Sequence, residues 1–506
     1  MRQLTGLEQV FLKLEGPTTS AVIGCLVRFD APQPGQPVPD EPFMRMRLHE
    51  RIPHIPPFRQ RVVPVPLGLD HAYLAESDRV DVERHLRTIT LAAPGDERAL
   101  SAEISRIMST DLAPDDPDGP RWDYTIIDGL ADGGLAHLMR AHHALADGST
   151  MLRIWDALAD DPQAPLPDHV ETRTLPQPLF GSTEMAARAA LGLAKKTYQV
   201  VKFEYDVVKW AASRYETEGL SALPGFVSSM LPGTAGRELT ALFNRRLRAR
   251  GAPELTQYTK TYGNGPDSPI NGRASSKRTV AYDEVAFDEV KSLSRLAGTT
   301  INNIVVTVAA GALRRFLTDL DPTGSAPTEP IVVSIPVSLW GDHVDHPWGN
   351  HVHMILADLP VHLADPLERL THVTEALIAA RASLDNTPAH LVNDFSSIIP
   401  PDFYGLVVKI WTRLPDKLSR PAWNVVVSNV RGPKKPDSLN GMRIRSYFPI
   451  SFLSIGGGIN ISLQSYVDRF CFGIVGAPDK TGDLWPLVGH LREALEELRT
   501  ALEARG

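Results

Sequence analysis

The seven residues His142-His143-Ala144-Leu145-Ala146-Asp147-Gly148 begin at the last residue of a run typical of a β-strand, residues 135–142. They precede a helical pattern that begins near Ser149. At average residue usage, the pattern HHxxxDG is expected by chance in about one in a thousand chains of this length. Neighbouring strand residues point to opposite faces, so only one of the two histidines can face a given cleft. The other must pack or form a hydrogen bond on the far side. The segment is therefore our first candidate for a functional site.

Structural explanations for the same residues remain open. His142 and His143 fit a satisfied pair of strand histidines as well as a catalytic pair. Asp147 is explained most simply as the N-cap of the helix that starts near Ser149. Gly148 permits a sharp turn and removes a side chain where a ligand could pass close to the backbone.

Working outward, the first 165 residues alternate between strand and helix patterns. The spacing of apolar residues predicts strands at 21–29, 122–128 and 135–142, and a helix at 97–112. A stretch rich in Pro and Asp at 160–178 is the clearest linker. A long basic helical pattern follows at 184–214, which we expect either to bridge two domains or, less simply, to lie on a membrane surface.

The alternation resumes after about residue 276. Helices are expected at 288–297, 299–317 and 486–503, and strands at 331–337, 352–359, 423–428, 460–466 and 470–475. The chain is thus expected to form two mixed α/β halves, 1–165 and 276–506, joined by a linker region at 166–275.

Composition narrows the function classes. The 506 residues carry a formal net charge of -8, and 43% are hydrophobic, as in an ordinary globular protein. The acidic balance argues against a nucleic-acid binder held by a general basic field. No run of 18 apolar residues occurs, and the start resembles no secretory signal. Two isolated cysteines, Cys25 and Cys471, fit a reducing cytoplasm.

Three other patterns are weaker candidates for a site. His343, His346, His351 and His353 match no standard zinc spacing, so we expect no metal. The run at 456–458 lacks the ending of a phosphate-binding loop and is interpreted as a turn or bulge. Residues 115–119 lack the later Glu of a calcium loop and are interpreted as a solvated turn.

The HHxxxDG segment resembles that of the chloramphenicol-acetyltransferase-like superfamily, and the chain is most similar to its bacterial wax ester synthase/diacylglycerol acyltransferase family. The similarity covers most of the chain and is weakest between about 160 and 265. Besides HHxxxDG, it rests on segments 7–12, 15–19, 57–61, 93–100, 120–122, 311–315, 336–339, 349–350 and 428–433.

The resemblance implies two acetyltransferase-like domains, each a mixed β-sheet with flanking helices, with a substrate tunnel between them. It assigns the base to His143 and a mainly structural role to Asp147. The family's Asn-Asp pair near the reaction centre corresponds to Asn302-Asn303, and its Pro-Leu-Trp to Pro120-Arg121-Trp122, so Asn303 and Arg121 depart from the family pattern. The expected catalytic set is His142, His143, Asp147 and Asn302, with Asn302 as a candidate oxyanion donor. Residues expected to bind substrate are Gly148, Trp122, Asn303, Ser428, Asn429 and Gly432.

The expected activity is transfer of a long-chain acyl group from acyl-CoA to diacylglycerol or a long-chain alcohol, without cofactor or metal. Because such products are apolar lipids, we expect the enzyme to act at a membrane or lipid-inclusion surface. The helical pattern at 184–214 is the expected contact. One alternative is a condensation-like enzyme that uses a carrier-protein donor or another hydroxylated lipid, and another is a non-catalytic lipid-binding protein. The acceptor, the preferred chain length and the oligomeric state stay open at this stage.

Overall fold

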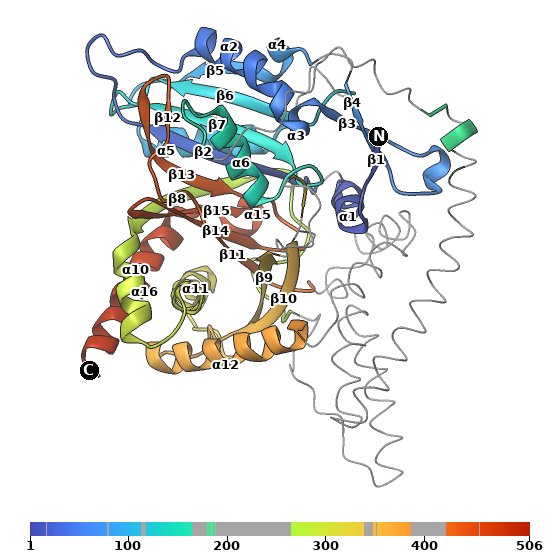
Figure 1. Ribbon diagram of the computed structural model, residues 1–506. Coiled ribbons are helices and arrows are strands. Elements are labelled where there is room, and N and C mark those ends of the chain that lie inside the picture. The colour runs from blue at the N-terminus through green and yellow to red at the C-terminus, as the bar shows by residue number, and fades with distance from the viewer. Residues whose placement is uncertain are drawn as a thin grey trace.

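The structure is a computed structural model that describes residues 1–163, 180–188, 265–338, 348–385 and 421–505. Short gaps within these ranges fall at 17, 78–79, 113–117, 182, 186–187, 351 and 455. Figure 1 shows two six-stranded sheets, one above the other, with helices on their outer faces. The long helical pattern at 184–214 and the linker at 160–178 fall largely outside the described residues.

The first sheet is built mainly from the N-terminal half of the chain. Its order is β12-β13-β2-β7-β6-β5, and β5 and β6 run parallel while the other pairs are antiparallel. The strands are β2 (Val22–Phe29), β5 (Leu86–Thr90), β6 (Trp122–Asp128), β7 (Leu135–His142), β12 (Ser438–Leu439) and β13 (Met442–Ile450). The sheet is therefore mixed, and its last two strands come from the other half of the sequence.

Short helices and a small third sheet surround the first sheet. The three-stranded sheet has the order β1-β4-β3 and stands beside α1 (Gly6–Leu14) (Figure 1). Its strands are β1 (Arg2–Gln3), β3 (Gln60–Val63) and β4 (Tyr73–Glu76). The helices are α2 (Glu41–Arg51), α3 (Pro56–Arg59), α4 (Val82–His85), α5 (Glu97–Met108) and α6 (Gly148–Leu158), with single 3₁₀ turns at Ile52–His54 and Pro66–Gly68.

The second sheet is also mixed, with the order β10-β9-β11-β14-β15-β8. Only β11 is parallel to its neighbours, β9 and β14. The strands are β8 (Thr279–Ala286), β9 (Ile331–Ser338), β10 (Val352–Leu359), β11 (Val425–Val430), β14 (Ile459–Tyr466) and β15 (Arg469–Gly476). Four long helices cover its lower face in Figure 1: α10 (Phe287–Leu296), α11 (Ile301–Leu320), α12 (Pro366–Asp385) and α16 (Trp485–Glu503), while α15 (Pro478–Thr481) is one turn.

A shared apolar core joins the two halves. Leu100, Ile104 and Ile107 on α5 pack in one cluster with residues of both sheets, such as Val22 on β2 and Tyr282 on β8. The helix is also bound to β8, because Ser101 Oγ donates to the Val280 carbonyl at 2.5 Å and Ser105 Oγ accepts from the Val280 amide at 2.9 Å. This contact fixes one sheet against the other along their shared face.

The expected α/β architecture with two mixed sheets is confirmed. The predicted strands and helices all occur where residues are described, with ends shifted by a few positions. The division at residue 276 does not hold for β12 and β13, because these strands lie in the expected domain 276–506 yet pair into the first sheet. Among the described residues no single helix is long and apolar enough to span a bilayer, although α10 and α11 together, bent by 100°, meet the criteria of length and composition.

Candidate functional site

His143 is the first residue after β7 and lies where the two halves meet. Its amide donates to the Ala21 carbonyl at 2.7 Å, which extends the β7 pairing by one residue. The chain then turns, with the Leu145 amide on the His142 carbonyl at 2.8 Å, and enters α6. His142 is fully buried while His143 keeps part of its side chain exposed. The two histidines thus differ in access, as the strand geometry requires.

Two phenylalanines enclose the His143 ring. Phe11 from α1 stacks on it, with ring centroids 4.3 Å apart and planes 11° from parallel. Phe452, just after β13, meets it edge-on at 5.1 Å. This apolar setting penalises the imidazolium, and burial lowers the pKa of His143 from its ordinary value of 6.5 to about 4, although the charge of Asp147 acts in the opposite direction. His143 is therefore a neutral imidazole at physiological pH.

Asn350 occupies one ring nitrogen of His143. Its Nδ2 lies 2.8 Å from His143 Nδ1 and donates to the His143 carbonyl at 2.9 Å. The carbonyls of His143 and Ala146 also act as hydrogen-bond acceptors for this ring. Within the described part of the chain, Nε2 has no hydrogen-bond partner. Nδ1 thus faces protein groups, and Nε2 is the ring nitrogen without a partner there.

Asp147 anchors the turn after the histidines rather than the ring itself. Its Oδ1 accepts from the Thr150 amide at 2.8 Å, so it is the N-cap of α6, as its sequence position indicated. Gly349 of the second half docks on the same turn: its carbonyl accepts from the Asp147 amide at 3.3 Å and from Thr150 Oγ1 at 2.8 Å. The HHxxxDG segment is therefore in contact with the loop that carries Asn350.

Glu15 and Arg121 stand behind His142. His142 Nδ1 accepts from the Ala144 amide at 3.0 Å, so its ring proton is on Nε2, which lies 3.0 Å from Glu15 Oε1. Arg121 Nη2 is 3.1 Å from the same carboxylate. Burial lowers the pKa of His142. Burial would raise the pKa of Glu15, but His142 and Arg121 outweigh it and the pKa is lowered.

Trp122, expected to bind substrate, lies in the core of the first half instead. It is fully buried, its Nε1 donates to the Phe58 carbonyl at 2.9 Å, and its faces stack on Phe58 and His85 at 4.1 Å and 4.3 Å. Protein groups therefore accept the indole N–H hydrogen bond and cover both faces of the ring, so neither face is left for a substrate.

The Asn302-Asn303 pair lies at the start of α11. Asn303 is buried, and its amide bonds to Thr299, Thr300 and Thr374, so it ties the helix start to α12. Asn302 is half-buried and makes no side-chain hydrogen bond to a described residue. No hydrogen bond joins either residue to His143 among the described residues, and the role of Asn302 as oxyanion donor stays a prediction.

The remaining expected substrate residues line the contact between β11 and its neighbours. A Cβ on Gly148 would lie 2.9 Å from Val430 Cγ2, so close packing of the second half explains this glycine. A Cβ on Gly432 would lie 1.9 Å from the Ser465 carbonyl, which requires glycine on steric grounds alone. Ser428 and Asn429 are half-buried on β11.

The histidine cluster, the glycine run and the acidic loop form no metal or phosphate site among the described residues. Of the four clustered histidines only His353 is described, and no three His, Cys, Asp or Glu residues converge among the described positions. The run at 456–458 forms a turn, as interpreted: the Gly457 amide donates to Ser454 and that of Gly458 to Asn424. Residues 113–117 lie outside the described chain.

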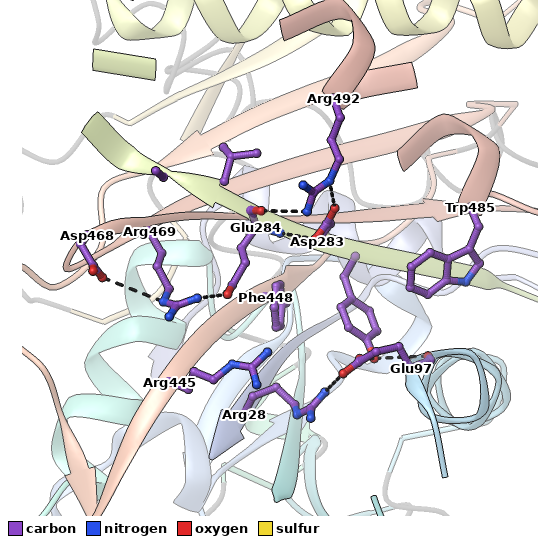
Figure 2. A pocket seen from close by; sticks show the side chains of 13 residues that line it. Arg28, Glu97, Asp283, Glu284, Arg445, Phe448, Asp468, Arg469, Trp485 and Arg492 are labelled. Atoms are coloured by element: carbon purple, nitrogen blue, oxygen red, sulfur yellow. Dashed lines mark hydrogen bonds and ion pairs between the residues drawn. The ribbon is translucent and has the colours of Figure 1, made fainter. Parts of the chain in front are cut away.

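A separate cavity of about 520 Å³ opens between the halves, away from His143 (Figure 2). Arg28, Arg445 and Arg469 point into it, facing Glu97 and Glu284. Arg28 lies at the other end of β2 from Val22, the partner of His142, about 20 Å along an extended strand. Arg28 bonds to Glu97 and Asp132 at 2.6 and 2.8 Å, and Arg469 to Glu284, so the charges largely cancel one another.

Comparison with known proteins identifies the family. Residues 4–305 match the model of the wax ester synthase/diacylglycerol acyltransferase catalytic domain, and residues 348–499 that of the WS/DGAT C-terminal domain. The chain belongs to the wax ester synthase/diacylglycerol acyltransferase family. This confirms the resemblance read from the HHxxxDG segment and its surroundings.

Relatives from Mycobacterium tuberculosis (strain ATCC 25618 / H37Rv) align along the whole chain. The protein named "Putative diacyglycerol O-acyltransferase Rv3480c" is 31% identical over 526 residues, covering 100% of this chain and 98% of its own. "Putative diacyglycerol O-acyltransferase Rv1760" is 28% identical over 501 residues, covering 98% of this chain and 90% of its own.

Solved structures agree on the fold. The wax ester synthase/diacylglycerol acyltransferase from Marinobacter aquaeolei VT8 superposes with a TM-score of 0.64 at 22% identity, covering 99% of this chain and 100% of that one. The first condensation domain of the calcium-dependent antibiotic synthetase gives a TM-score of 0.54 at 18% identity, covering 99% and 96%. The family fold is thus shared with condensation domains.

In this family member, sequence reasoning found His142, His143 and Asp147 but not the residues that surround them. Glu15 and Asn350 lie in segments that resemble the family. The sequence therefore marked both residues as family-like, but it assigned neither of them a function. Phe11 belongs to a matching segment as well, whereas nothing in the sequence singled out Phe452.

Proposed function

We propose that this chain is an O-acyltransferase that moves a long-chain acyl group from acyl-CoA to an alcohol, diacylglycerol or a fatty alcohol, with His143 as general base. The observation that carries the proposal is the contrast between the two nitrogens of His143. Nδ1 lies beside the Asn350 amide and faces the protein, whereas Nε2 of this neutral, half-buried imidazole has no hydrogen-bond partner among the described residues.

The reaction follows from this arrangement. In the tautomer with the ring proton on Nδ1, in which Asn350 Nδ2 donates to the His143 carbonyl alone, Nε2 accepts the hydroxyl proton as the alcohol oxygen attacks the thioester carbonyl carbon. The tetrahedral intermediate collapses, the carbon–sulfur bond breaks, and the imidazolium returns the proton to the departing thiolate. The products are an ester and free CoA, and no proton or electron is gained or lost. The thioester supplies the activation, so this route needs no metal or cofactor.

Direct transfer is favoured over a covalent acyl-cysteine intermediate. Cys25 and Cys471 are both buried, and burial raises the pKa of the Cys25 thiol and that of Cys471 to about 12. A nucleophilic cysteine needs a lowered pKa and some exposure. Neither thiol meets these conditions.

The acceptor and the product are lipids in this proposal, so the enzyme should work at a membrane or lipid-inclusion surface. The basic segment at 184–214 remains the proposed contact, and its cations include Arg188, Lys195, Lys196, Lys202 and Lys209. Binding to anionic vesicles that persists after charge reversal at these lysines would contradict this assignment.

The test measures thiol release from palmitoyl-CoA with diacylglycerol and hexadecanol offered separately. The wild-type protein should release thiol only with an acceptor, and His143→Ala should lose about 10²- to 10⁴-fold of that rate. His49→Ala, at an exposed position on α2, is the control histidine exchange and should retain activity. Wild-type rates in His143→Ala would contradict the mechanism.

The same assay separates the alternatives. Activity only with a palmitoylated carrier protein would indicate a condensation-like enzyme. Binding of palmitoyl-CoA without release of thiol, for either acceptor, would indicate a lipid-binding protein that keeps the fold.

A further inference from the structure

Three aromatic rings contact one another at the proposed base. Phe11 stacks on the imidazole of His143 with the ring centroids 4.3 Å apart, and Phe452 meets the same ring edge-on at 5.1 Å. The two phenyl rings also meet each other in a T-shape at 5.6 Å. All three side chains are half-buried. The phenyl rings therefore cover one face of the imidazole and part of its surroundings with apolar surface.

Helix α1, which carries the stacked phenylalanine, is fixed at its start. Thr5 and Glu8 form a capping box, and Arg2 on β1 donates two hydrogen bonds to the Glu8 carboxylate, both at 2.8 Å. The side chain of Gln9 accepts from the Ala72 amide at 2.9 Å. Ala72 directly precedes β4, so both contacts lead to the small three-stranded sheet. This sheet therefore determines where α1 and its phenyl ring lie.

A second side chain of α1 contacts the HHxxxDG segment. Leu12 packs against a buried cluster made of Leu4, Ala72, Leu74 and Leu145. Leu145 lies two residues after His143, in the turn that leads to α6. The helix is thus in contact with the turn that follows the proposed base, and this contact keeps the ring of Phe11 over the imidazole.

This apolar cover matters because a neutral imidazole does not by itself distinguish water from an alcohol. Nε2 of His143, which has no hydrogen-bond partner among the described residues, can take a proton from either. When water attacks the thioester carbonyl carbon, the carbon–sulfur bond breaks and the imidazolium returns the proton to the thiolate. The products are then a fatty acid and CoA, and no ester is made. An O-acyltransferase therefore has to keep water away from its base.

We propose that Phe11, together with Phe452, keeps water from His143 and so directs the acyl group to an alcohol, an inference that rests on the proposed function. A water molecule is held in place only where it has about two to four polar partners, and the two phenyl rings offer it none. The chain of a lipid alcohol instead gains free energy by lying against the same apolar rings. The two phenylalanines thus determine specificity and move no proton themselves.

The experiment follows the palmitoyl group rather than the thiol. Palmitoyl-CoA is supplied with hexadecanol, and the ester and the free palmitate are measured together, after subtraction of the hydrolysis that occurs without enzyme. The wild type should give mainly ester, and Phe11→Ala should raise the ratio of palmitate to ester severalfold. This ratio does not depend on how much of the protein is folded, because unfolded molecules make neither product. An unchanged ratio in Phe11→Ala would overturn the proposal.

Further variants identify the cause of a changed ratio. Phe452→Ala should shift it in the same direction, and Phe11→Leu, which keeps an apolar side chain, should restore most of the wild-type ratio. The matched control is Phe180→Ala, because Phe180 packs edge-on against Tyr73 at 5.9 Å on the same small sheet, and it should leave the ratio unchanged. When His143→Ala is added to Phe11→Ala, the palmitate should fall to the uncatalysed level. Palmitate that persists in this double variant would overturn the proposal, since water would then not use this base.

A measurement without turnover separates this proposal from the proposed function. Diethyl pyrocarbonate modifies neutral imidazoles, and peptide mass spectrometry locates the modified histidine. His143 should react severalfold faster in Phe11→Ala than in the wild type, and at the wild-type rate in Phe180→Ala. Equal rates in Phe11→Ala and the wild type would overturn the shielding role even in an enzyme that makes ester. A faster reaction in a protein that makes neither product would support the shielding and contradict the proposed activity alone.

Discussion

The Asn350 side chain lies against the Nδ1 side of the His143 ring, with Nδ2 2.8 Å from Nδ1 and 2.9 Å from the carbonyl oxygen of the same residue. The two residues come from opposite halves of the chain. The orientation of the His143 ring, our proposed base, therefore depends on how the halves dock, and not on the HHxxxDG segment alone.

This contact predicts the effect of Asn350→Ala. Loss of the amide releases the His143 carbonyl and lets the ring rotate, so kcat should fall roughly tenfold to a hundredfold, part of what a general base contributes. The KM for palmitoyl-CoA should change little. Thiol-release kinetics check both values. Because Asn350 is buried, a melting curve must first show that the variant is folded. An unchanged kcat in a folded variant would contradict the positioning role of Asn350.

The pH dependence of kcat/KM should show an acid limb near pH 4. The neutral imidazole is the active form, and burial lowers the pKa of His143 to about 4, so activity rises with pH through that value and is level by neutrality. Phe11→Ala admits water to the ring, which should move the limb upward toward 6.5. A wild-type limb already near 6.5 would show that the stacked ring does not control the base.

Glu15 and Arg121 offer a test of the support behind His142. Glu15→Ala leaves the buried Nε2–H of His142 unpaired and should lower the free energy of unfolding by about 1–3 kcal/mol. Glu15→Gln keeps an acceptor oxygen and should restore most of that loss. Arg121→Leu introduces the residue of the family's Pro-Leu-Trp pattern; because Arg121 is partly exposed, the cost should be no more than about 1 kcal/mol. Denaturant unfolding at neutral pH measures all three.

Three histidines with lowered pKa values predict a loss of stability on acidification. Burial lowers the pKa of His142, of His143 to about 4 and of His137 to about 3, all from 6.5. Between these values and 6.5 only the unfolded chain binds the protons, so the free energy of unfolding rises with pH and is lost as pH falls, by up to about 1.4 kcal/mol per pH unit for each histidine.

His137→Asn isolates one of these contributions. Asparagine can still meet the Tyr124 hydroxyl, which is 2.7 Å from His137 Nδ1, but it does not titrate. The slope of the unfolding free energy against pH should drop by about one proton below pH 6.5. The exposed exchange His49→Asn serves as control. A slope that is identical in His137→Asn would mean that this histidine is protonated in the native state.

Local patterns predicted the strands and helices, because alternation and helical spacing report which face of each element is buried. They could not predict that β13 pairs with β2, since Tyr447 and Val27 are far apart in the sequence and neither carries a mark of its partner. The pairing of β13 with β2 forms only when both halves of the chain fold together.

The site was predicted in part for the same reason. The HHxxxDG segment contains the proposed base and the N-cap within a single turn, so His143 and Asp147 stand out locally. Trp122 also belongs to a matching segment, but which face of its strand meets a cavity depends on Phe58 and His85, brought there by tertiary packing. The family-like segment thus identified Trp122 as a candidate but could not predict which residues surround it.

Gly148 provides the sharpest test of packing against substrate contact. Gly148→Ala would place Cβ 2.9 Å from Val430 Cγ2, so we expect about 1–3 kcal/mol of destabilisation from overpacking. Val430→Ala removes the obstructing methyl groups and should recover most of this loss in the double variant, together with activity. A double-mutant cycle on unfolding free energy measures the coupling. If stability recovers but activity with palmitoyl-CoA does not, Gly148 is needed for the substrate as well as for the contact between the halves.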